Sequence, residues 1–324
     1  MDSNRHEAEV QEIQEAHRLI REAVGAYVVG NHELIDLMMI GLLTGGHILI
    51  DGTPGTAKTT ISKIVARLCG FQFNRVQGVF DVQPADILGV RVFHSELQQF
   101  VLQNGPIFSN FILIDEINRL TPKTQSAFIE AMAEHQVTID GIKYPLEDPF
   151  FVVATQNSQE FEGTFPLIEA QRDRFTFSIA LHYLDPESEF EILRRDRDGD
   201  LEWDEYWRKV TPVLSIERVL TLSRYVATIR VSDRILRYIR DIIVASREHN
   251  DVLLGCSSRG ALAFLRGARA AAAIDGRTYV IPDDVKRMAE PVMAHRLILE
   301  RGSEFDWGSI KRVITGILED VEVA

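Results

Sequence analysis

The sequence predicts an α/β fold with a parallel sheet, followed by a smaller all-helical domain. Apolar segments of strand length alternate with helical patterns up to about residue 183, which is typical of chains that build a parallel sheet. Beyond about residue 210 only helical patterns remain, and the charge-rich segment 186–210 between the two regions is predicted to be a linker. The expected domains are therefore an α/β core over residues 1–185 and a helical domain over residues 211–324.

Residues 48–60 indicate an apolar strand, a glycine-bearing loop and the start of a helix. The loop is close to the phosphate-binding pattern G-x-x-x-x-G-K-[ST]. Backbone amides of such a loop and of the following helix N-terminus bind anions. We therefore expect Lys58 on the β- and γ-phosphates of a nucleotide and Thr59 on Mg²⁺, whereas an ordinary strand–turn–helix would need neither side chain. The residues expected to contact the nucleotide in this loop are Gly52, Thr53, Pro54, Gly55, Thr56, Ala57, Lys58, Thr59 and Thr60.

Ala57 stands where the phosphate-binding pattern usually has its second glycine. Because alanine readily adopts right-handed helical dihedral angles, we expect the loop to form in spite of this change. The match to the pattern is nevertheless imperfect, and a match of that kind can arise without function.

Composition and charge restrict the class of protein. Hydrophobic residues make up 45% of the 324 residues, which is enough for a core, and charged residues make up 26%, as in ordinary globular proteins. The formal net charge of -13 argues against general affinity for nucleic acids or anionic membranes. The N-terminus lacks the basic start and apolar core of a signal peptide, and no apolar run reaches the roughly 20 residues of a membrane span. Two cysteines without paired spacing fit a reducing compartment, so we expect a cytoplasmic protein.

Individual elements are predicted from hydrophobic periodicity and from turn and cap residues. The expected strands are residues 47–51, 71–76, 111–114, 150–154 and 175–181. The expected helices are residues 7–25, 32–44, 59–68 and 122–134 in the core, then 215–229, 232–248, 258–273, 282–296 and a last one around 310–318. Two hairpins are expected, one at residues 87–104 near a short helix and one at residues 136–144 around the turn pair Asp140-Gly141.

Polar side chains follow two of the continuous apolar strands, at the edge where parallel strands present ligand-binding residues. Asp115 and Glu116 close the first of these strands. Since phosphoryl transfer depends mostly on positioning and charge stabilisation, we expect Asp115 to hold Mg²⁺ through a water and Glu116 to polarise the attacking water. Asn157 follows the next strand and could orient that water, with Thr155 as a weaker candidate. The alternatives are a solvated acid pair and an asparagine in a turn.

Several longer runs carry a family resemblance. In the core they are Gly105-Pro-Ile-Phe-Ser-Asn110, Ile114-Asp-Glu-Ile-Asn-Arg119, Pro122-Lys-Thr-Gln-Ser126, Ala154-Thr-Gln-Asn157, Glu162-Gly-Thr-Phe-Pro-Leu167 and Glu169-Ala-Gln-Arg-Asp-Arg-Phe175. In the helical domain they are Gly255-Cys-Ser-Ser-Arg259 and Asp275-Gly-Arg-Thr-Tyr-Val-Ile-Pro-Asp-Asp-Val285. With these runs the chain resembles the MoxR family of AAA+ ATPases over roughly residues 25–296, and that family often has alanine before the loop lysine.

The resemblance implies a P-loop AAA+ core whose five-stranded parallel sheet has the order 5-1-4-3-2, with a C-terminal helical lid. It implies ATP and Mg²⁺ as cofactors and a homo-oligomeric ring, most often a hexamer. Asn157 would be the first sensor of the γ-phosphate, Arg174 the arginine finger that reaches the neighbouring subunit, and Arg259 the second sensor within the same chain. Gly30 belongs to the stretch 28–31, which would border the adenine base.

Each of these arginines has an alternative reading. The planar, permanently charged guanidinium suits phosphate recognition, but Arg172 competes with Arg174 for the role between subunits. Arg119 is a third candidate, and its simpler role is a salt bridge. Arg259 could merely follow a helix N-cap serine.

The function implied by the resemblance is Mg²⁺-dependent ATP hydrolysis that drives chaperone-like remodelling of protein complexes. Metal-cofactor insertion or complex maturation would be typical tasks, commonly with a von Willebrand factor A-domain partner. The two hairpins could be handles on a client protein or a pore, or ordinary surface hairpins. One alternative is an assembly module that uses ATP as a conformational switch with little turnover, which the intact Glu116 disfavours. Another is a ring motor acting on nucleic acid, which the net charge of -13 disfavours.

Overall fold

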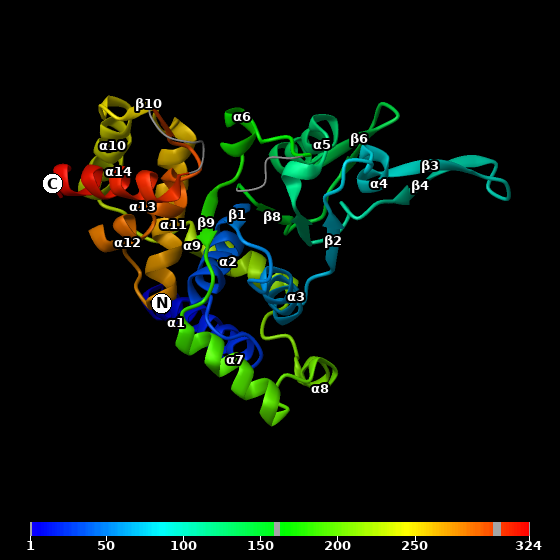
Figure 1. Cartoon of the computed structure of the whole chain (residues 1–324), viewed down its shortest axis with the longest axis horizontal. Helices are drawn as coiled ribbons and strands as arrows, with labels where there is room; N and C mark the ends of the chain where they lie inside the picture. The colour runs from blue at the N-terminus through cyan, green and yellow to red at the C-terminus, as the bar shows by residue number, and fades with distance from the viewer. Residues whose placement is uncertain (1, 159–162, 301–305, 324) are drawn as a thin grey trace.

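Five parallel strands form the central sheet of the protein (Figure 1). The computed structural model describes residues 2–158, 163–300 and 306–323. The strands of the sheet are β1 (Ile48–Gly52), β2 (Phe73–Gln77), β5 (Phe111–Asp115), β8 (Phe151–Gln156) and β9 (Phe177–Leu181). Their spatial order is β2-β5-β8-β1-β9. Numbered along the chain this is 2-3-4-1-5, which is 5-1-4-3-2 when read from β9. The predicted sheet topology is therefore confirmed.

Both faces of this sheet are buried, which explains why its central strands are continuous apolar runs. Along β1, Ile48 and Ile50 belong to one hydrophobic cluster, whereas Leu49 belongs to a second cluster on the opposite face. The helices that cover the two faces are α1 (Asp2–Gly25), α2 (His32–Thr44) and α3 (Lys58–Leu68) on the first and α5 (Pro122–Glu134) on the second (Figure 1).

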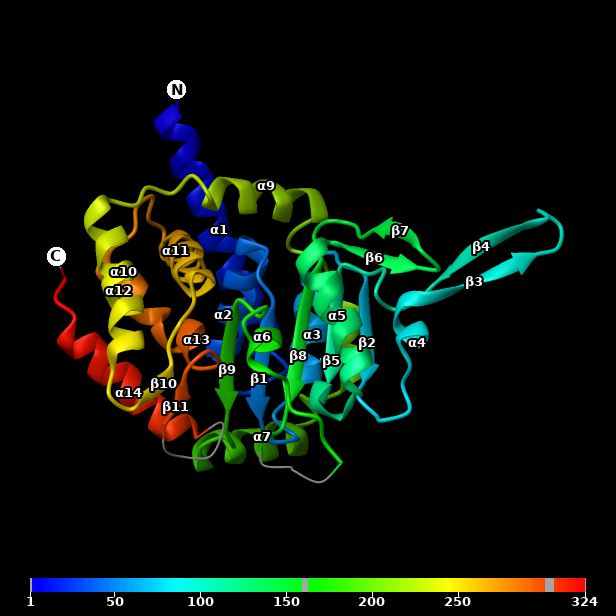
Figure 2. The same ribbon diagram turned by 90° about the horizontal axis from the view of Figure 1, so that it is seen from above.

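The longer of the two predicted hairpins projects far from the core (Figure 2). It consists of β3 (Gly89–His94) and β4 (Gln99–Asn104) and follows the short helix α4 (Pro84–Leu88). Phe93 and Phe100 form an edge-to-face pair on it, with ring centroids 5.4 Å apart, and both rings are exposed. The predicted hairpin next to a short helix is thus present.

The shorter hairpin consists of β6 (Gln136–Ile139) and β7 (Ile142–Pro145). Its turn residues Asp140 and Gly141 have φ angles of 50° and 77°. Both values are left-handed, which is the backbone conformation that a two-residue hairpin turn requires. The prediction based on this residue pair is confirmed.

The predicted linker 186–210 connects the core to the lid, but it does so as two helices. These are α7 (Pro186–Asp198) and α8 (Trp203–Lys209). The α8 helix packs on α3, where the ammonium of Lys63 lies 4.8 Å from the ring centroid of Trp207. The charged composition that suggested a linker therefore belongs to two surface helices.

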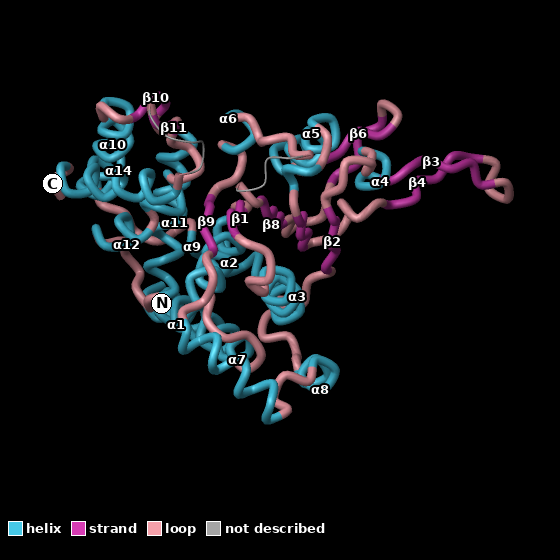
Figure 3. Tube along the Cα trace, viewed as in Figure 1, coloured by secondary structure: helices cyan, strands magenta, loops and turns pink. Residues whose placement is uncertain are grey.

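Within the described residues of the C-terminal lid, the regular elements are helices and one short two-stranded ladder (Figure 3). The prediction of an all-helical lid missed this ladder, since two and three residues are too few for a readable periodicity. The predicted single helix 282–296 is also wrong: the helix breaks at Met288, because Pro291 has no N–H to donate to the carbonyl of Arg287. The elements of the lid are α9 (Ile216–Val226), α10 (Asp233–Glu248), β10 (Val252–Leu254), α11 (Ser258–Ile274), α12 (Pro282–Arg287), α13 (Ala289–Met293), β11 (Ile298–Leu299) and α14 (Trp307–Asp320).

The lid packs against the core through a shared hydrophobic cluster and a polar clamp. The alanines at 270–273 in α11 are fully buried in the cluster that also contains α1, α2 and the first face of the sheet. His295 lies 2.7 Å from the hydroxyl of Ser178 in β9 and 2.9 Å from the carbonyl oxygen of Phe175. Arg296 donates to the same Phe175 carbonyl at 2.8 Å. The lid therefore holds the segment that leads into β9.

Candidate functional site

The phosphate-binding loop connects the carboxyl end of β1 to the first turn of α3. A Cβ at Gly52 would lie 2.5 Å from the carbonyl oxygen of Leu181, and Gly55 has a φ of +83°, so both positions require glycine. Ala57 precedes α3 with a φ of 57° and a ψ of 16°. The expected right-handed conformation of Ala57 is therefore wrong. This left-handed position is one where glycine is unstrained and a residue with a Cβ costs roughly 1–2 kcal/mol.

Lys58 lies against the loop that precedes it. Its ammonium donates to the carbonyl oxygen of Gly52 at 2.9 Å and to that of Thr53 at 2.7 Å. Burial lowers the pKa of Lys58 below its usual value, although nearby carboxylates, led by Asp115, oppose the shift. The ammonium is thus placed at the helix N-terminus, where phosphate groups bind in loops of this kind.

A hydrogen bond joins the two residues that were predicted to hold magnesium. The hydroxyl of Thr59 donates to Oδ2 of Asp115 at 3.2 Å. Hydroxyl and carboxylate oxygens are ligands that Mg²⁺ prefers, and a nucleotide-bound Mg²⁺ usually takes only one or two protein ligands. The side chains of Thr59 and Asp115 therefore fit this ion.

Glu116 follows β5 in the left-handed conformation, with a φ of 58°. Its backbone N–H donates to the hydroxyl of Thr155 at 2.9 Å, and that hydroxyl donates to Oδ1 of Asp115 at 3.4 Å, so one threonine contacts both acids. The Glu116 carboxylate accepts a hydrogen bond from Gln77 and pairs with Nε of Arg119, both at 3.2 Å. The salt bridge considered for Arg119 is thus present, and its partner is the candidate general base.

The sequence analysis missed two polar residues of β2 that belong to this site. Arg75 donates from Nε to Oδ2 of Asp115 and from Nη2 to Gln77, both at 2.6 Å. The signal is the alternation of polar and apolar residues along this segment, which by itself predicts only a strand. Because β2 is an edge strand with Gln77 in register with Asp115, its polar side chains lie beside the acids.

Asn157 directly follows β8, the strand that lies between the loop strand β1 and the acid strand β5. Its backbone carbonyl accepts a hydrogen bond from the side chain of Asn118 at 3.4 Å. The preceding residue Gln156 is in register with Asp51, the last residue before the first glycine of the loop. The structure therefore places Asn157 between the loop and the acids at one edge of the sheet.

Arg172 and Arg174 lie just before β9, and their surroundings differ. Arg172 ends the short helix α6 (Glu169–Arg172) and is only 4% exposed, whereas Arg174 is partly exposed. An arginine that acts on a neighbouring subunit must reach the surface, which favours Arg174. This segment leads into the amino end of β9, whereas the phosphate-binding loop follows the carboxyl end of the parallel strand β1.

Arg259 lies with the segment before β9. Its Nη1 is 3.3 Å from Oδ2 of Asp173, and its backbone N–H binds the side chain of the N-cap residue Ser257 at 3.1 Å. The paired strands β1 and β9 have five residues each, so roughly 13 Å separate their two ends. The structure therefore does not bring Arg259 to the phosphate-binding loop of its own chain, which was the expectation for a second sensor acting within one chain.

The stretch 28–31 packs next to the phosphate-binding loop. The side-chain amide of Asn31 donates to the carbonyl oxygen of Thr56 at 3.4 Å. Gly30 has a φ of +75°, and a Cβ there would lie 2.8 Å from Cδ2 of Leu184. The predicted role beside the adenine base is compatible with this position.

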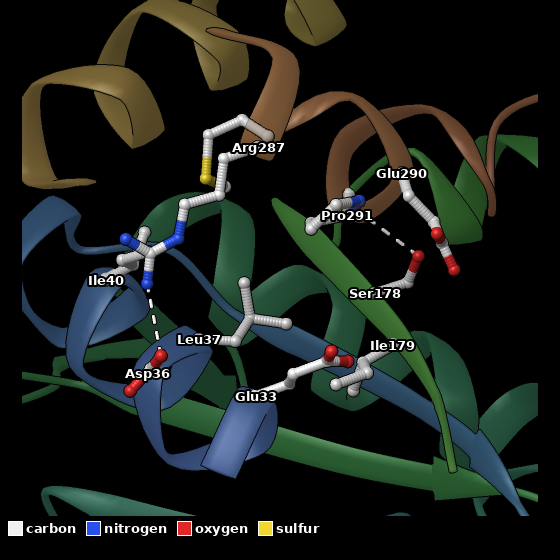
Figure 4. Close-up of a pocket in the computed structure, with 10 residues that line it drawn as sticks. Glu33, Asp36, Leu37, Ile40, Ser178, Ile179, Arg287, Glu290 and Pro291 are labelled. Carbon is white, nitrogen blue, oxygen red and sulfur yellow. Dashed lines mark hydrogen bonds and ion pairs between the residues drawn. The ribbon is translucent and has the colours of Figure 1, made fainter. Parts of the chain in front are cut away.

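A cavity of about 230 Å³ lies between α2, β9 and the lid helices α12 and α13 (Figure 4). Its lining includes the acids Glu33, Asp36 and Glu290, and Arg287 pairs with Asp36 across it at 3.1 Å. None of its lining residues belongs to the phosphate-binding loop. Since three carboxylates would repel phosphate groups, this cavity at the junction of core and lid does not suit a nucleotide.

Two expectations concern features outside the site. Glu162, in the run 162–167 that contributes to the family resemblance, lies outside the described residues. Across the described ranges, each helix is too short or too polar to cross a lipid bilayer.

Comparisons with known proteins agree with this architecture. Residues 47–177 match the ATPase family associated with various cellular activities (AAA), and residues 244–314 match the AAA lid domain. The chain is 38% identical to YeaC of Bacillus subtilis over 96% of both chains, and 38% identical to Chaperone MoxR1 of Mycobacterium tuberculosis over 95% of this chain and 82% of that one. The crystal structure of a proposed ATPase from Cytophaga hutchinsonii superposes with a TM-score of 0.88 at 37% identity, over 100% of this chain and 99% of the other. With a P-loop core, a helical lid and such relatives along nearly its whole length, the chain belongs to the MoxR family of AAA+ ATPases.

Proposed function

We propose that this ATPase hydrolyses ATP with Mg²⁺ at a site that a neighbouring subunit completes. The observation that carries the proposal is the hydrogen bond between Thr59 and Asp115. It joins the phosphate-binding loop to the acidic end of β5, and Thr155 then links Asp115 to Glu116. A phosphate cradle, a magnesium ligand and a carboxylate base thus meet at one edge of the sheet, which is what hydrolysis of a phosphoanhydride needs.

Each side chain has one task in this proposal. Lys58 binds the β- and γ-phosphate oxygens and balances their charge. Glu116 accepts a proton from the attacking water, and Asn157 orients that water toward the γ-phosphate. Mg²⁺, held by Thr59 and Asp115, would supply charge neutralisation on the phosphate oxygens.

Arg174 is proposed to act on the nucleotide of the neighbouring subunit. It is partly exposed and precedes the amino end of β9, away from the loop of its own chain. We place Arg259 on the same surface because it pairs with Asp173, the neighbour of Arg174. A homo-oligomeric ring, with a hexamer as the expected size, would bring this surface to the next subunit's loop.

The proposed use of this activity is chaperone-like remodelling of protein complexes. Support comes from the relative named Chaperone MoxR1, which is 38% identical to this chain. Maturation of a complex or insertion of a metal cofactor, with a von Willebrand factor A-domain protein as partner and in the cytoplasm, is the specific form that we propose. Capture of clients on a Glu116→Gln variant loaded with ATP, followed by mass spectrometry, would identify the substrate.

Two substitutions separate ATP binding from turnover. Lys58→Ala should abolish detectable ATP binding in calorimetry, because it removes the cation at the base of the loop. Glu116→Gln should bind ATP as the parent does but lower kcat by at least about 100-fold, since the amide cannot accept the water proton. Parent-like binding by Lys58→Ala, or parent-like turnover by Glu116→Gln, would overturn the proposed site.

A further inference from the structure

The carboxylate of Asp51 lies at the junction of the loop strand, the sensor strand and the lid. Asp51 is the residue before Gly52, and it is only 6% exposed. It has no place in the phosphate-binding pattern, which begins at the glycine. Because burying a carboxylate is costly unless it is hydrogen-bonded, Asp51 requires hydrogen-bond donors close to both of its oxygens.

Four hydrogen-bond donors converge on this carboxylate. The side-chain amide of Gln156 lies 3.2 Å from Oδ2, and the backbone N–H of Ser158 lies 3.3 Å from Oδ1. The hydroxyl of Ser158 also donates to Oδ2. The fourth donor is the indole N–H of Trp307, at 3.0 Å from Oδ2. An ionised carboxylate accepts at both oxygens and can satisfy such a set, whereas an amide would present two donors of its own.

Two of these partners flank the candidate sensor. Gln156 and Ser158 are the residues immediately before and after Asn157. Both are tied to one carboxylate whose own backbone continues directly into the phosphate-binding loop. The main chain on either side of Asn157 is therefore fixed relative to the site where the γ-phosphate would bind, as a supporting residue behind a catalytic side chain should do.

The remaining partner comes from the lid. Trp307 is the first residue of α14, which is anchored in the core cluster by Ile310, Val313, Ile314 and Ile317. The hydrogen bond from its indole N–H to Asp51 joins two residues that lie 256 positions apart in the sequence. Displacement of the lid would remove one donor from the carboxylate that holds the sensor segment.

We propose that Asp51 is a positioning residue for Asn157, and that Trp307 makes this positioning depend on the docked lid. This inference rests on the proposed function, since it requires Asn157 to act on the γ-phosphate or the attacking water. It assigns Asp51 no contact with substrate.

The first test is Asp51→Asn, which keeps the size of the side chain but places an NH₂ group among four donors. We expect kcat to fall by about 10- to 100-fold, because small misplacement of an orienting group has effects of that size. The affinity for ATP should change less than about threefold, since the loop keeps its lysine and its amides. A parent-like kcat in this variant would overturn the proposal.

A double-mutant cycle separates positioning from a general structural role. If Asp51 acts through Asn157, then Asp51→Asn should cause no further loss of kcat in an Asn157→Ala background. An equal loss in both backgrounds would overturn the inference while leaving the proposed function intact. A parent-like kcat in Asn157→Ala alone would instead overturn the sensor assignment of the proposed function. Should Asp51→Asn fail to fold, Ser158→Ala, which removes one donor to the same carboxylate, replaces it in the cycle.

The dependence of this positioning on the docked lid is tested by Trp307→Phe. This substitution keeps an aromatic ring and removes the N–H donor. We expect a drop in kcat that is absent in the Asp51→Asn background. Trp207→Phe is the matched control, because Trp207 packs on α3 through Lys63 and Arg67 and does not contact Asp51. A parent-like kcat in Trp307→Phe, or an equal loss in the control, would overturn the coupling to the lid.

Discussion

At the scale of single residues, the loop carries a conformation that its alanine does not favour. Ala57 has a φ of 57° at the entry to α3. Ala57→Gly should therefore raise the free energy of unfolding by about 1 kcal/mol, by removing the cost of a Cβ in the left-handed region. Urea denaturation measures the change. The control Ala66→Gly, at a fully buried right-handed position in the last turn of α3, should lower it by about 1 kcal/mol. A loss of stability in Ala57→Gly would contradict this account.

The buried imidazole of His47 predicts a pH dependence of stability. Burial lowers the pKa of His47 to about 4. Its Nδ1 accepts the backbone N–H of Val152 at 3.1 Å, and its Nε2 lies 3.4 Å from the carbonyl oxygen of Met132, so the folded protein holds the neutral form. Between the unfolded value of 6.5 and about 4, the unfolded chain binds a proton that the folded chain does not. Stability therefore falls as the pH falls through this window.

The variant His47→Gln tests this pH dependence. It should reduce the slope of unfolding free energy against pH by up to about 1.4 kcal/mol per pH unit inside that window. Above pH 6.5 the slopes of variant and parent should coincide. Chemical denaturation at a series of pH values gives both slopes. Equal slopes at acid pH would show that His47 does not titrate in this way.

The loop and the acids could be predicted because they follow local patterns. Lys58, Thr59, Asp115 and Glu116 sit at fixed offsets from an apolar strand, so their residue types and spacing were sufficient. Arg75 could not be recognised in this way. Its partner lies 40 residues away on a neighbouring strand, and only the sheet register brings the two together.

At the scale of elements, the lid is held to the core by a buried arginine. The side chain of Arg296 is 3% exposed, pairs with Asp173 at 2.8 Å and donates to the backbone carbonyl of Phe175. Arg296→Met should lower the free energy of unfolding by about 3–5 kcal/mol, because it leaves a partly buried carboxylate with fewer partners. Denaturation curves of parent and variant measure the loss.

Arg287→Met is the matched control for this prediction. Arg287 also joins the lid to the core, through Asp36, but its side chain is 36% exposed. An exposed ion pair contributes little, so the control should lose no more than about 1 kcal/mol. Equal losses in the two variants would contradict the role of burial at Arg296.

Most helices and strands could be predicted where a single hydrophobic periodicity dominates the segment. The apolar runs of β5 and β8 and the turn pair of the short hairpin have strong local signals. The segment 186–210 was predicted to be a linker because its many charges gave no helical periodicity, but α8 packs on α3 and Arg195 of α7 donates to the carbonyl oxygen of Gly25 in α1. The break at Met288 follows from a proline three residues later, which outweighs helical periodicity.

At the scale of the whole molecule, the candidate catalytic groups are divided between the carboxyl ends and the amino ends of the parallel strands. The loop, the acids and Asn157 lie at the carboxyl edge, whereas Arg174 precedes the amino end of β9. The strand order was implied by the family resemblance, and the register of the sheet then fixes which groups share an edge. A single chain cannot bring both sets together without dismantling the sheet, so the proposed site needs two subunits.

Mixing two inactive variants tests this central claim most directly. Arg174→Ala and Glu116→Gln should each lack ATPase activity alone. In mixed rings, an Arg174→Ala subunit keeps its own Glu116 and can receive an intact Arg174 from a Glu116→Gln neighbour, so the mixture should recover part of the parent's activity. A mixture of Lys58→Ala with Glu116→Gln should stay inactive, because both changes affect the same half of the site. Absence of recovery in the first mixture, with the rings intact, would contradict an arginine that acts between subunits.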